Sequence, residues 1–178
     1  MVALQRGCTA QWSGVIQAVR ERSISEGRGA EERDPAAAER SRLLRQAALA
    51  GHVPAMYQLG IECTDRKERS HWLREAAHEG YVPAMYAFGL MCKQLGCRRS
   101  WLRKAAEEGH VEAMYAMSSE VDDFEERKYW LRMAADEGHV AAMYYWGLVC
   151  DDPYERERWL NEAARNGCEA AMAELCDD

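Results

Sequence analysis

The sequence predicts an all-α fold, a right-handed α/α superhelical solenoid of five stacked 29-residue repeats, each built from two antiparallel helices. The first observation is a fixed period, because glycines recur every 29 residues at Gly51, Gly80, Gly109, Gly138 and Gly167. The second is a motif that keeps this phase, with Leu-Arg-x-Ala-Ala before the glycine and Ala-Met-Tyr after it in the first four copies. A fixed period of this length is typical of arrays in which neighbouring repeats bury a shared core.

The first helix of each repeat (helix A) is expected to end at the periodic glycine. In the second repeat it should run from about Arg66 to Glu79, with Asp65 as its N-terminal cap. Asp123 and Asp152 stand at comparable positions in later repeats. The apolar residues of helix A in the second repeat share one face, at Trp72, Leu73, Ala76 and Ala77. Glycine tolerates the left-handed conformation that closes a helix, which explains its place at the end of helix A.

The second helix (helix B) follows that glycine and carries its own apolar face. In the second repeat this face holds Met85, Phe88, Gly89 and Cys92. Gly60, Gly89 and Gly147 lie in the middle of helix B, with Ser118 in their place in the third copy. A mid-helix glycine costs about 1 kcal/mol relative to alanine, so we expect a neighbouring helix to cross there. The spacing also predicts that the methionine series is buried, at Met56, Met85, Met114, Met143 and Met172.

The composition narrows the classes of partner. The chain has 178 residues and a formal net charge of −7, which argues against a nucleic acid or an anionic membrane as partner. We see no signal peptide and no membrane span, and we expect a cytoplasmic protein. Three of the seven cysteines, Cys63, Cys92 and Cys150, share one repeat position and are interpreted as buried thiols.

No cofactor and no metal are expected. Cys92 and Cys97 flank a turn, but the sequence offers no second cysteine pair to complete a zinc site. His52, His110 and His139 share the position after the periodic glycine, so they stand one repeat apart and cannot converge on one ion. We interpret them as turn residues that cap backbone groups.

The predicted organisation has two parts. Residues 1–34 should form an amphipathic helix followed by a charged linker, with Trp12, Val15, Ile16 and Val19 on one face of the helix. Residues 35–178 form the array, with repeats at about 37–64, 65–93, 94–122, 123–151 and 152–178. The N-terminal helix either caps the first repeat or binds a partner itself.

At this point the motifs support a resemblance. The string Trp72-Leu-Arg-Glu-Ala-Ala-His-Glu-Gly80, followed by Ala84-Met-Tyr-Ala-Phe-Gly89, resembles the Sel-one-like repeat (SLR), a relative of the tetratricopeptide repeat. The resemblance covers about residues 37–178. It implies a superhelix whose helices A line a concave face that binds other proteins, as adaptors and scaffolds do. The chain departs from the usual pattern at an early alanine of helix A, which is replaced by Arg40, Arg69, Arg98, Arg127 and Arg156.

Those arginines allow two interpretations. They share a helical stripe with the buried leucine and alanine, so they should not extend freely into solvent. They either form a ladder of ion pairs between repeats, or they form a basic stripe that recognises carboxylates of a partner, with Arg69, Arg98 and Arg127 at its centre. A second series is expected to be more exposed, with Arg103 and Arg132 pairing with Glu107 and Asp136 on the same helix.

Binding specificity should come from positions that vary between repeats while the framework stays constant. On the exposed side of helix A, the predicted partner-binding residues are His71, Lys104, Tyr129, Met133 and Arg158. Aromatic residues and methionine are enriched in interface cores. The alternative is a plain solvated face.

The predicted function is therefore a non-enzymatic protein-interaction module, an adaptor, scaffold or regulator that binds a protein or peptide in a groove lined by the helices A. Alternatives are a toxin-neutralising immunity-type binder, which rests on the resemblance alone, and a structural unit that associates with itself as a homo-oligomer. Some cysteine-rich SLR proteins are associated with β-lactam hydrolysis. This chain lacks cysteine pairs within its repeats and has no Ser-x-x-Lys motif, so we expect no such activity.

Overall fold

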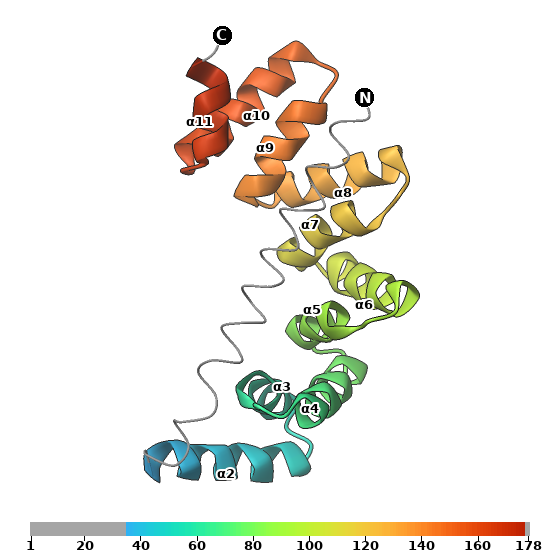
Figure 1. Cartoon of the computed structure of the whole chain (residues 1–178), viewed down its shortest axis with the longest axis vertical. Coiled ribbons are helices and arrows are strands. Elements are labelled where there is room, and N and C mark those ends of the chain that lie inside the picture. The colour runs from blue at the N-terminus through green and yellow to red at the C-terminus, as the bar shows by residue number, and fades with distance from the viewer. Residues whose placement is uncertain (1–34, 177–178) are drawn as a thin grey trace. The chain divides into compact units, whose positions relative to one another are not determined.

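A computed structural model describes residues 35–176, which form ten α-helices and no β-strand (Figure 1). This confirms the predicted all-α class and the arrangement of the helices in consecutive pairs. The predicted N-terminal helix lies outside the described residues. By its internal contacts the chain divides into two compact units at Glu79 and Gly80, which falls between the two helices of the second repeat.

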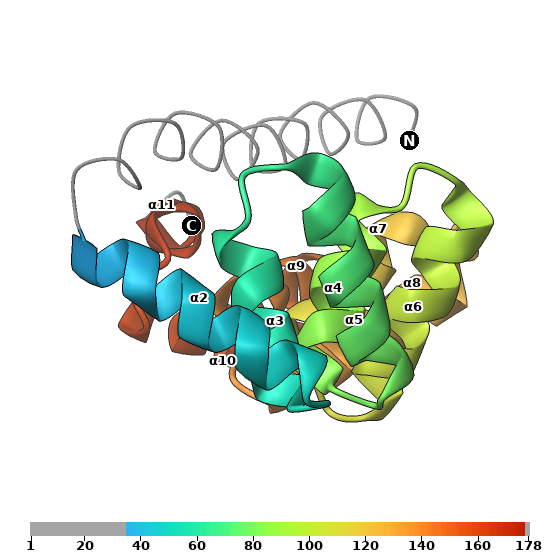
Figure 2. The same ribbon diagram turned by 90° about the horizontal axis from the view of Figure 1, so that it is seen from below.

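The first unit contains three described helices, α2 (Pro35–Leu49), α3 (Val53–Glu62) and α4 (Arg66–His78). Helix α3 packs against both of the others, and Figure 2 shows α2 lying alongside it. The buried core of this unit consists of Ala48, Ala55, Leu59 and Cys63. The half-buried Trp72 of α4 packs against this cluster, so the second repeat completes the core of the first.

The second unit contains α5 (Val82–Met91), α6 (Leu95–Glu107), α7 (Val111–Glu120), α8 (Phe124–Asp136), α9 (Val140–Val149), α10 (Pro153–Arg165) and α11 (Glu169–Cys176). Each helix packs against the next one along the chain, from α5 through to α11. Leu102 and Met117 are among the most completely buried side chains, and the paired alanines of α6 and α8 are buried as well. These contacts confirm that neighbouring repeats bury a shared core.

Both predicted signals at the ends of helix A are present. Asp65 and Asp123 each accept a hydrogen bond from a backbone N–H three residues on, at 2.9 and 2.8 Å. Asp152 also accepts a hydrogen bond, from the backbone N–H of Tyr154 two residues on, at 2.9 Å. At the other end of helix A, the five periodic glycines all have positive φ, between 86° and 91°. That conformation disfavours any residue with a Cβ atom, which explains why the period is kept without a slip.

The predicted capping role of the histidines is also confirmed. The imidazole Nδ1 atoms of His52, His110 and His139 accept hydrogen bonds from the backbone N–H groups of Ala55, Ala113 and Ala142, at 3.2, 3.3 and 3.1 Å. Each histidine is therefore the N-cap of a helix B. An imidazole can do this only with Nδ1 unprotonated, so the cap requires the neutral ring.

The mid-helix glycines mark close approaches between helices, as predicted. A Cβ atom built on Gly60 would lie 2.7 Å from Cγ of Leu73 and 3.2 Å from the Leu73 backbone nitrogen. At Gly89 and Gly147 the equivalent atom would lie 3.2 and 3.1 Å from the leucine of the following helix A. The glycines therefore let the leucine of the next repeat pack directly on helix B.

The prediction for the methionine series is wrong at its last member. Met85, Met114 and Met143 are buried, and Met56 is half-buried and packs against the core of the first unit, whereas Met172 of α11 is 42 % exposed. The earlier methionines are followed along the chain by another repeat, and α11 is the final described helix. The same repeat position therefore loses its cover at the end of the array, because each repeat is buried by its neighbour.

Candidate functional site

The arginines of the helix A stripe hold the ends of the preceding helices. Arg69 donates from Nε and Nη2 to the carbonyl oxygen of Cys63, at 2.9 and 2.6 Å. Arg98 makes the same pair of hydrogen bonds to the carbonyl of Cys92, at 3.2 and 3.1 Å. Arg127 and Arg156 each make one such bond, to the carbonyls of Val121 and Cys150. The acceptor in each case is the C-cap residue of helix B, whose carbonyl has no partner within its helix.

Two of these arginines also form ion pairs with the end of a helix B. Arg40 lies 2.5 Å from Glu62, and Arg98 lies 3.1 Å from Glu120. The Arg98 pair is the better shielded, with side chains 23 % and 16 % exposed. All of these arginines thus have contacts within the array, and the second interpretation, recognition of a partner by Arg69, Arg98 and Arg127, remains a proposal.

The second arginine series differs in part from its prediction. Arg103 does not pair with Glu107 on its own helix; its Nη2 lies 2.5 Å from Glu126 Oε1 on the next helix A. Arg132 does lie near Asp136, at 3.9 Å. The carboxylate of Glu126 belongs to the next repeat, and helical spacing predicts contacts only within one helix.

In the first unit, the variable face of helix A is represented by His71 on α4. Its ring is exposed and lies against the indole of Trp72, with 5.0 Å between ring centroids. Its Nδ1 lies 4.0 Å from a carboxylate oxygen of Glu75, one turn further along the helix.

In the second unit, the variable residues lie on α6, α8 and α10, and three of them approach the tryptophan of their own helix. The Lys104 ammonium lies 4.7 Å from the centroid of the Trp101 ring. Tyr129 packs edge-on against Trp130, with 5.0 Å between centroids. The guanidinium of Arg158 lies 4.9 Å from the ring centroid of Trp159. The tryptophan beside each variable residue is visible in the sequence, but its use as a platform is a finding of the structure.

Most of the variable side chains are exposed, whereas the leucines and alanines that recur in every helix A are largely buried. Tyr129 is 55 % exposed, Lys104 and Arg158 are exposed, and Met133 is half-buried. Neither Lys104 nor Arg158 has an ion-pair partner among the described residues, whereas Arg98, Arg99 and Arg103 on α6 each have one. These two cations can therefore accept a carboxylate from outside the array.

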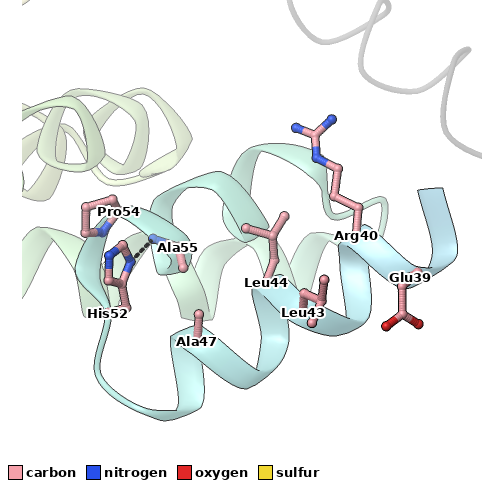
Figure 3. A pocket seen from close by; sticks show the side chains of 8 residues that line it. All are labelled: Glu39, Arg40, Leu43, Leu44, Ala47, His52, Pro54 and Ala55. Carbon is pink, nitrogen blue, oxygen red and sulfur yellow. Dashed lines mark hydrogen bonds between the residues drawn. The ribbon is translucent and has the colours of Figure 1, made fainter. Parts of the chain in front are cut away.

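An apolar groove of about 670 Å³ lies at the start of the array, over α2 and α3 (Figure 3). Leu43, Leu44 and Ala47 line it from α2, with Pro54 and Ala55 on the other side. Leu43 is 55 % exposed. In the array this is the place where the first repeat has no preceding repeat to cover it.

Residues 35–176 contain neither a cluster of metal ligands nor a membrane-spanning helix. No group of three or more His, Cys, Asp or Glu side chains lies close enough together to hold a metal ion. No helix in that range combines the length and the apolar character that crossing a bilayer requires.

The architecture defines a class of protein, the α-solenoids built from helical-hairpin repeats. The crystal structure of a Sel1 repeat protein from Oxalobacter formigenes is similar, with a TM-score of 0.66 and 22 % identity over 74 % of this chain and 64 % of that one. A second similar structure is c5321, a protective antigen present in uropathogenic Escherichia coli strains that displays an SLR fold. Its TM-score is 0.70, at 19 % identity over 93 % of this chain and 41 % of that one.

This chain therefore has the fold of the Sel1-like repeat proteins, which confirms the resemblance predicted from its motifs. It spans about two thirds and two fifths of the lengths of those two structures. No protein-family model and no curated protein matches the sequence.

Proposed function

We propose that the protein is a non-enzymatic interaction module, an adaptor, scaffold or regulator that binds a segment of another protein along the exposed side of its helices A. One observation carries the proposal. The framework residues are buried or bonded within the array, while three residues that differ between repeats are exposed and lie against a tryptophan, Lys104, Tyr129 and Arg158. Arrays of this kind bind through surfaces of this extended type.

The chemistry of the surface indicates what the partner segment should contain. Lys104 and Arg158 are exposed cations without a carboxylate partner among the described residues, so they suit acidic side chains. Tyr129 and Met133 lie between them in sequence, on α8, and suit an apolar side chain. We expect a partner segment that combines acidic and apolar residues. His71 belongs to the first unit and is proposed as a partner-binding residue of that unit.

The helix A arginines have a lesser part in this proposal. Arg69 and Arg98 each use two nitrogen atoms on a backbone carbonyl, and Arg127 uses one. A partner carboxylate could reach only the N–H groups that remain. Their main contribution is therefore to hold the helices that present the variable residues.

Catalysis is not part of the proposal. The described residues offer no cluster of metal ligands, and the sequence has no Ser-x-x-Lys motif. The free thiols of the buried Cys63 and Cys150 fit a reducing compartment such as the cytoplasm.

The test is an affinity capture from native lysate with two matched pairs of variants. Lys104→Glu is compared with Lys93→Glu, an exposed lysine in the connection between α5 and α6. Tyr129→Ala is compared with Leu148→Ala, which truncates a side chain 38 % exposed on α9. Circular dichroism melts establish that all four variants fold as the wild type does.

We expect a protein that is retained by the wild type and by Lys93→Glu and Leu148→Ala, and lost by Lys104→Glu and Tyr129→Ala. A hot-spot aromatic residue typically contributes 2 kcal/mol or more, so loss of Tyr129 should weaken binding about 30-fold. Equal retention by all variants would contradict the proposed surface. Retention of a second copy of the chain alone would favour the self-associating alternative, and a bound toxin would favour the immunity-type alternative.

A further inference from the structure

The junction between the second and third repeats differs from the other junctions by a pair of cysteines that face each other across the connection between α5 and α6. Cys92 is the buried C-cap residue of α5, and Cys97 is a half-buried residue in the first turn of α6. Their Sγ atoms lie 2.8 Å apart. Both cysteines belong to the second unit, and four residues separate them in sequence.

The repeat explains why these two side chains meet. The position of Cys92 is also cysteine in two other repeats, at Cys63 and Cys150, whereas the position of Cys97 is glutamate at Glu68, Glu126 and Glu155. Between the fourth and fifth repeats, the Cys150 thiol donates to a carboxylate oxygen of Glu155, at 3.6 Å. The framework thus places the side chain at the position of Cys97 against the thiol at the position of Cys92. In the third repeat alone, a second thiol replaces the carboxylate.

This geometry suits a covalent bond better than a metal. A disulfide needs sulfur atoms about 2.05 Å apart, so closure from 2.8 Å requires a shift of less than about 1 Å. A structural zinc site needs four ligands, and the described residues gather no third metal-ligating side chain here.

We propose that Cys92 and Cys97 form a reversible disulfide, a redox-responsive staple across the start of α6. The inference goes beyond the proposed function and does not depend on it. The oxidant is a low-molecular-weight disulfide, which provides the two-electron exchange that the pair requires.

The reaction starts at Cys97, because Cys97 is the more accessible of the two thiols. Its thiolate attacks one sulfur of the small disulfide, forming a mixed disulfide and releasing one small thiolate. Cys92 then loses its proton and attacks Sγ of Cys97, which breaks the mixed disulfide and releases the second small thiolate. Two protein thiols are oxidised to one disulfide, the small disulfide is reduced to two thiols, and the two protons pass to the products.

The surroundings favour the role of Cys92 as the second thiol to react. Burial and the neighbouring Cys97 thiol raise the pKa of Cys92 to about 12, which disfavours its thiolate and leaves the first attack to Cys97. The guanidinium of Arg98 donates to the Cys92 carbonyl and lowers the pKa of its thiol, in opposition to burial. The bond would fix the first turn of α6 to the end of α5.

The test uses the full chain equilibrated with oxidised glutathione, followed by blocking of free thiols and digestion with trypsin. The two cysteines then lie on different peptides, Glu75–Lys93 and Gln94–Arg98. The repeats themselves supply the control substitutions. Cys97→Glu introduces the residue found at this position in other repeats, and Cys92→Val introduces the residue of the third repeat, Val121.

We expect the two peptides to be joined in the oxidised wild type, with the mass of two hydrogen atoms lost, and to separate after dithiothreitol. Cys92→Val should instead accumulate glutathione on Cys97, because the resolving thiol is absent. Cys63 and Cys150 should remain unlinked in all samples. A wild type that retains both thiols, or that accumulates glutathione on Cys97 without joining the peptides, would overturn the proposal.

Discussion

Gly60 shows how little space a single position of helix B can leave. A methyl group there would lie 2.7 and 2.8 Å from the side-chain atoms of Leu73. We predict that Gly60→Ala lowers the free energy of unfolding by about 1–2 kcal/mol, because the cost of overpacking exceeds the gain in helix propensity. Urea denaturation measures the change.

Gly96→Ala is the matched control, since no atom lies within 4 Å of its added Cβ and its backbone is not left-handed. It should leave stability unchanged or raise it by about 0.5 kcal/mol. Equal unfolding free energies for the two variants would mean that helix B and Leu73 can separate at no cost.

The histidine caps predict a pH dependence. Burial lowers the pKa of His110 and His139 below the ordinary 6.5, although the Glu112 carboxylate acts in the opposite direction. Each ring also lies against a tyrosine of the preceding repeat: His110 stacks on Tyr86, and His139 makes a tilted contact with Tyr115. Because the folded state binds these protons less tightly, the stability they contribute is complete above about pH 6.5 and is lost as the pH falls below it.

We therefore expect the free energy of unfolding to fall between about pH 7.5 and 5.5. The double variant His110→Asn, His139→Asn keeps a side-chain acceptor at both caps without a group that titrates in this range, so its fall should be smaller. Chemical denaturation at both pH values measures the difference. A fall as large in the variant as in the wild type would assign the pH dependence to other groups.

At the scale of elements, Arg98 links three helices. It belongs to α6, donates twice to the last carbonyl of α5, and pairs with Glu120 at the end of α7. We predict that Arg98→Met, which keeps much of the apolar stem, lowers the free energy of unfolding by about 1.5–3 kcal/mol, the range for hydrogen bonds to a charged group. Arg103→Met removes a half-exposed ion pair and should cost less than about 1 kcal/mol. Thermal melts of both variants compare them, and equal losses would contradict the capping role of Arg98.

The groove over α2 and α3 bears on the predicted N-terminal helix, which lies outside the described residues. We propose that the apolar face around Ile16 covers Leu43. The groove adjoins the start of α2, and the 12 residues between Arg22, where the predicted helix ends, and Pro35 can span about 40 Å. Deleting residues 1–20 should then lower the melting temperature.

A double-mutant cycle makes this test specific. Leu43→Ser should destabilise the full chain by about 1.5–3 kcal/mol and the shortened chain much less, because Leu43 is already 55 % exposed without cover. Additive effects of the two changes, or a melting temperature that the deletion leaves unchanged, would make the segment a free tail or a partner-binding peptide.

At the scale of the whole molecule, most of the fold could be predicted from one chain. The glycine period predicts the helix ends, and the mid-helix glycines predict where a neighbouring helix crosses, although the leucines that pack there are a finding of the structure. Because the same residue types recur at the same position of each repeat, the assignment of each helix is supported by several copies and not by one. The sequence did not predict the exposure of Met172, because the periodic pattern is the same whether or not another repeat covers the helix.

Side-chain contacts between repeats were harder to predict. Arg103 could reach Glu107 or Glu126, and helical spacing favours the first although the structure has the second. The meeting of Cys92 and Cys97 likewise depends on the angle between α5 and α6, which no periodicity specifies. For the candidate surface, the sequence identified the variable residues, but their tryptophan platform required the structure.

The contacts that join successive repeats have a kinetic consequence. Arg98 and Glu120, or Tyr115 and His139, are fewer than 25 residues apart, so neighbouring repeats can assemble without a search by distant parts of the chain. Folding can then begin within any pair of repeats and propagate outward, at the fast rates typical of low contact order. Opening should proceed in the reverse order, so that amide hydrogens of α11 exchange with solvent long before those of α7 and α8.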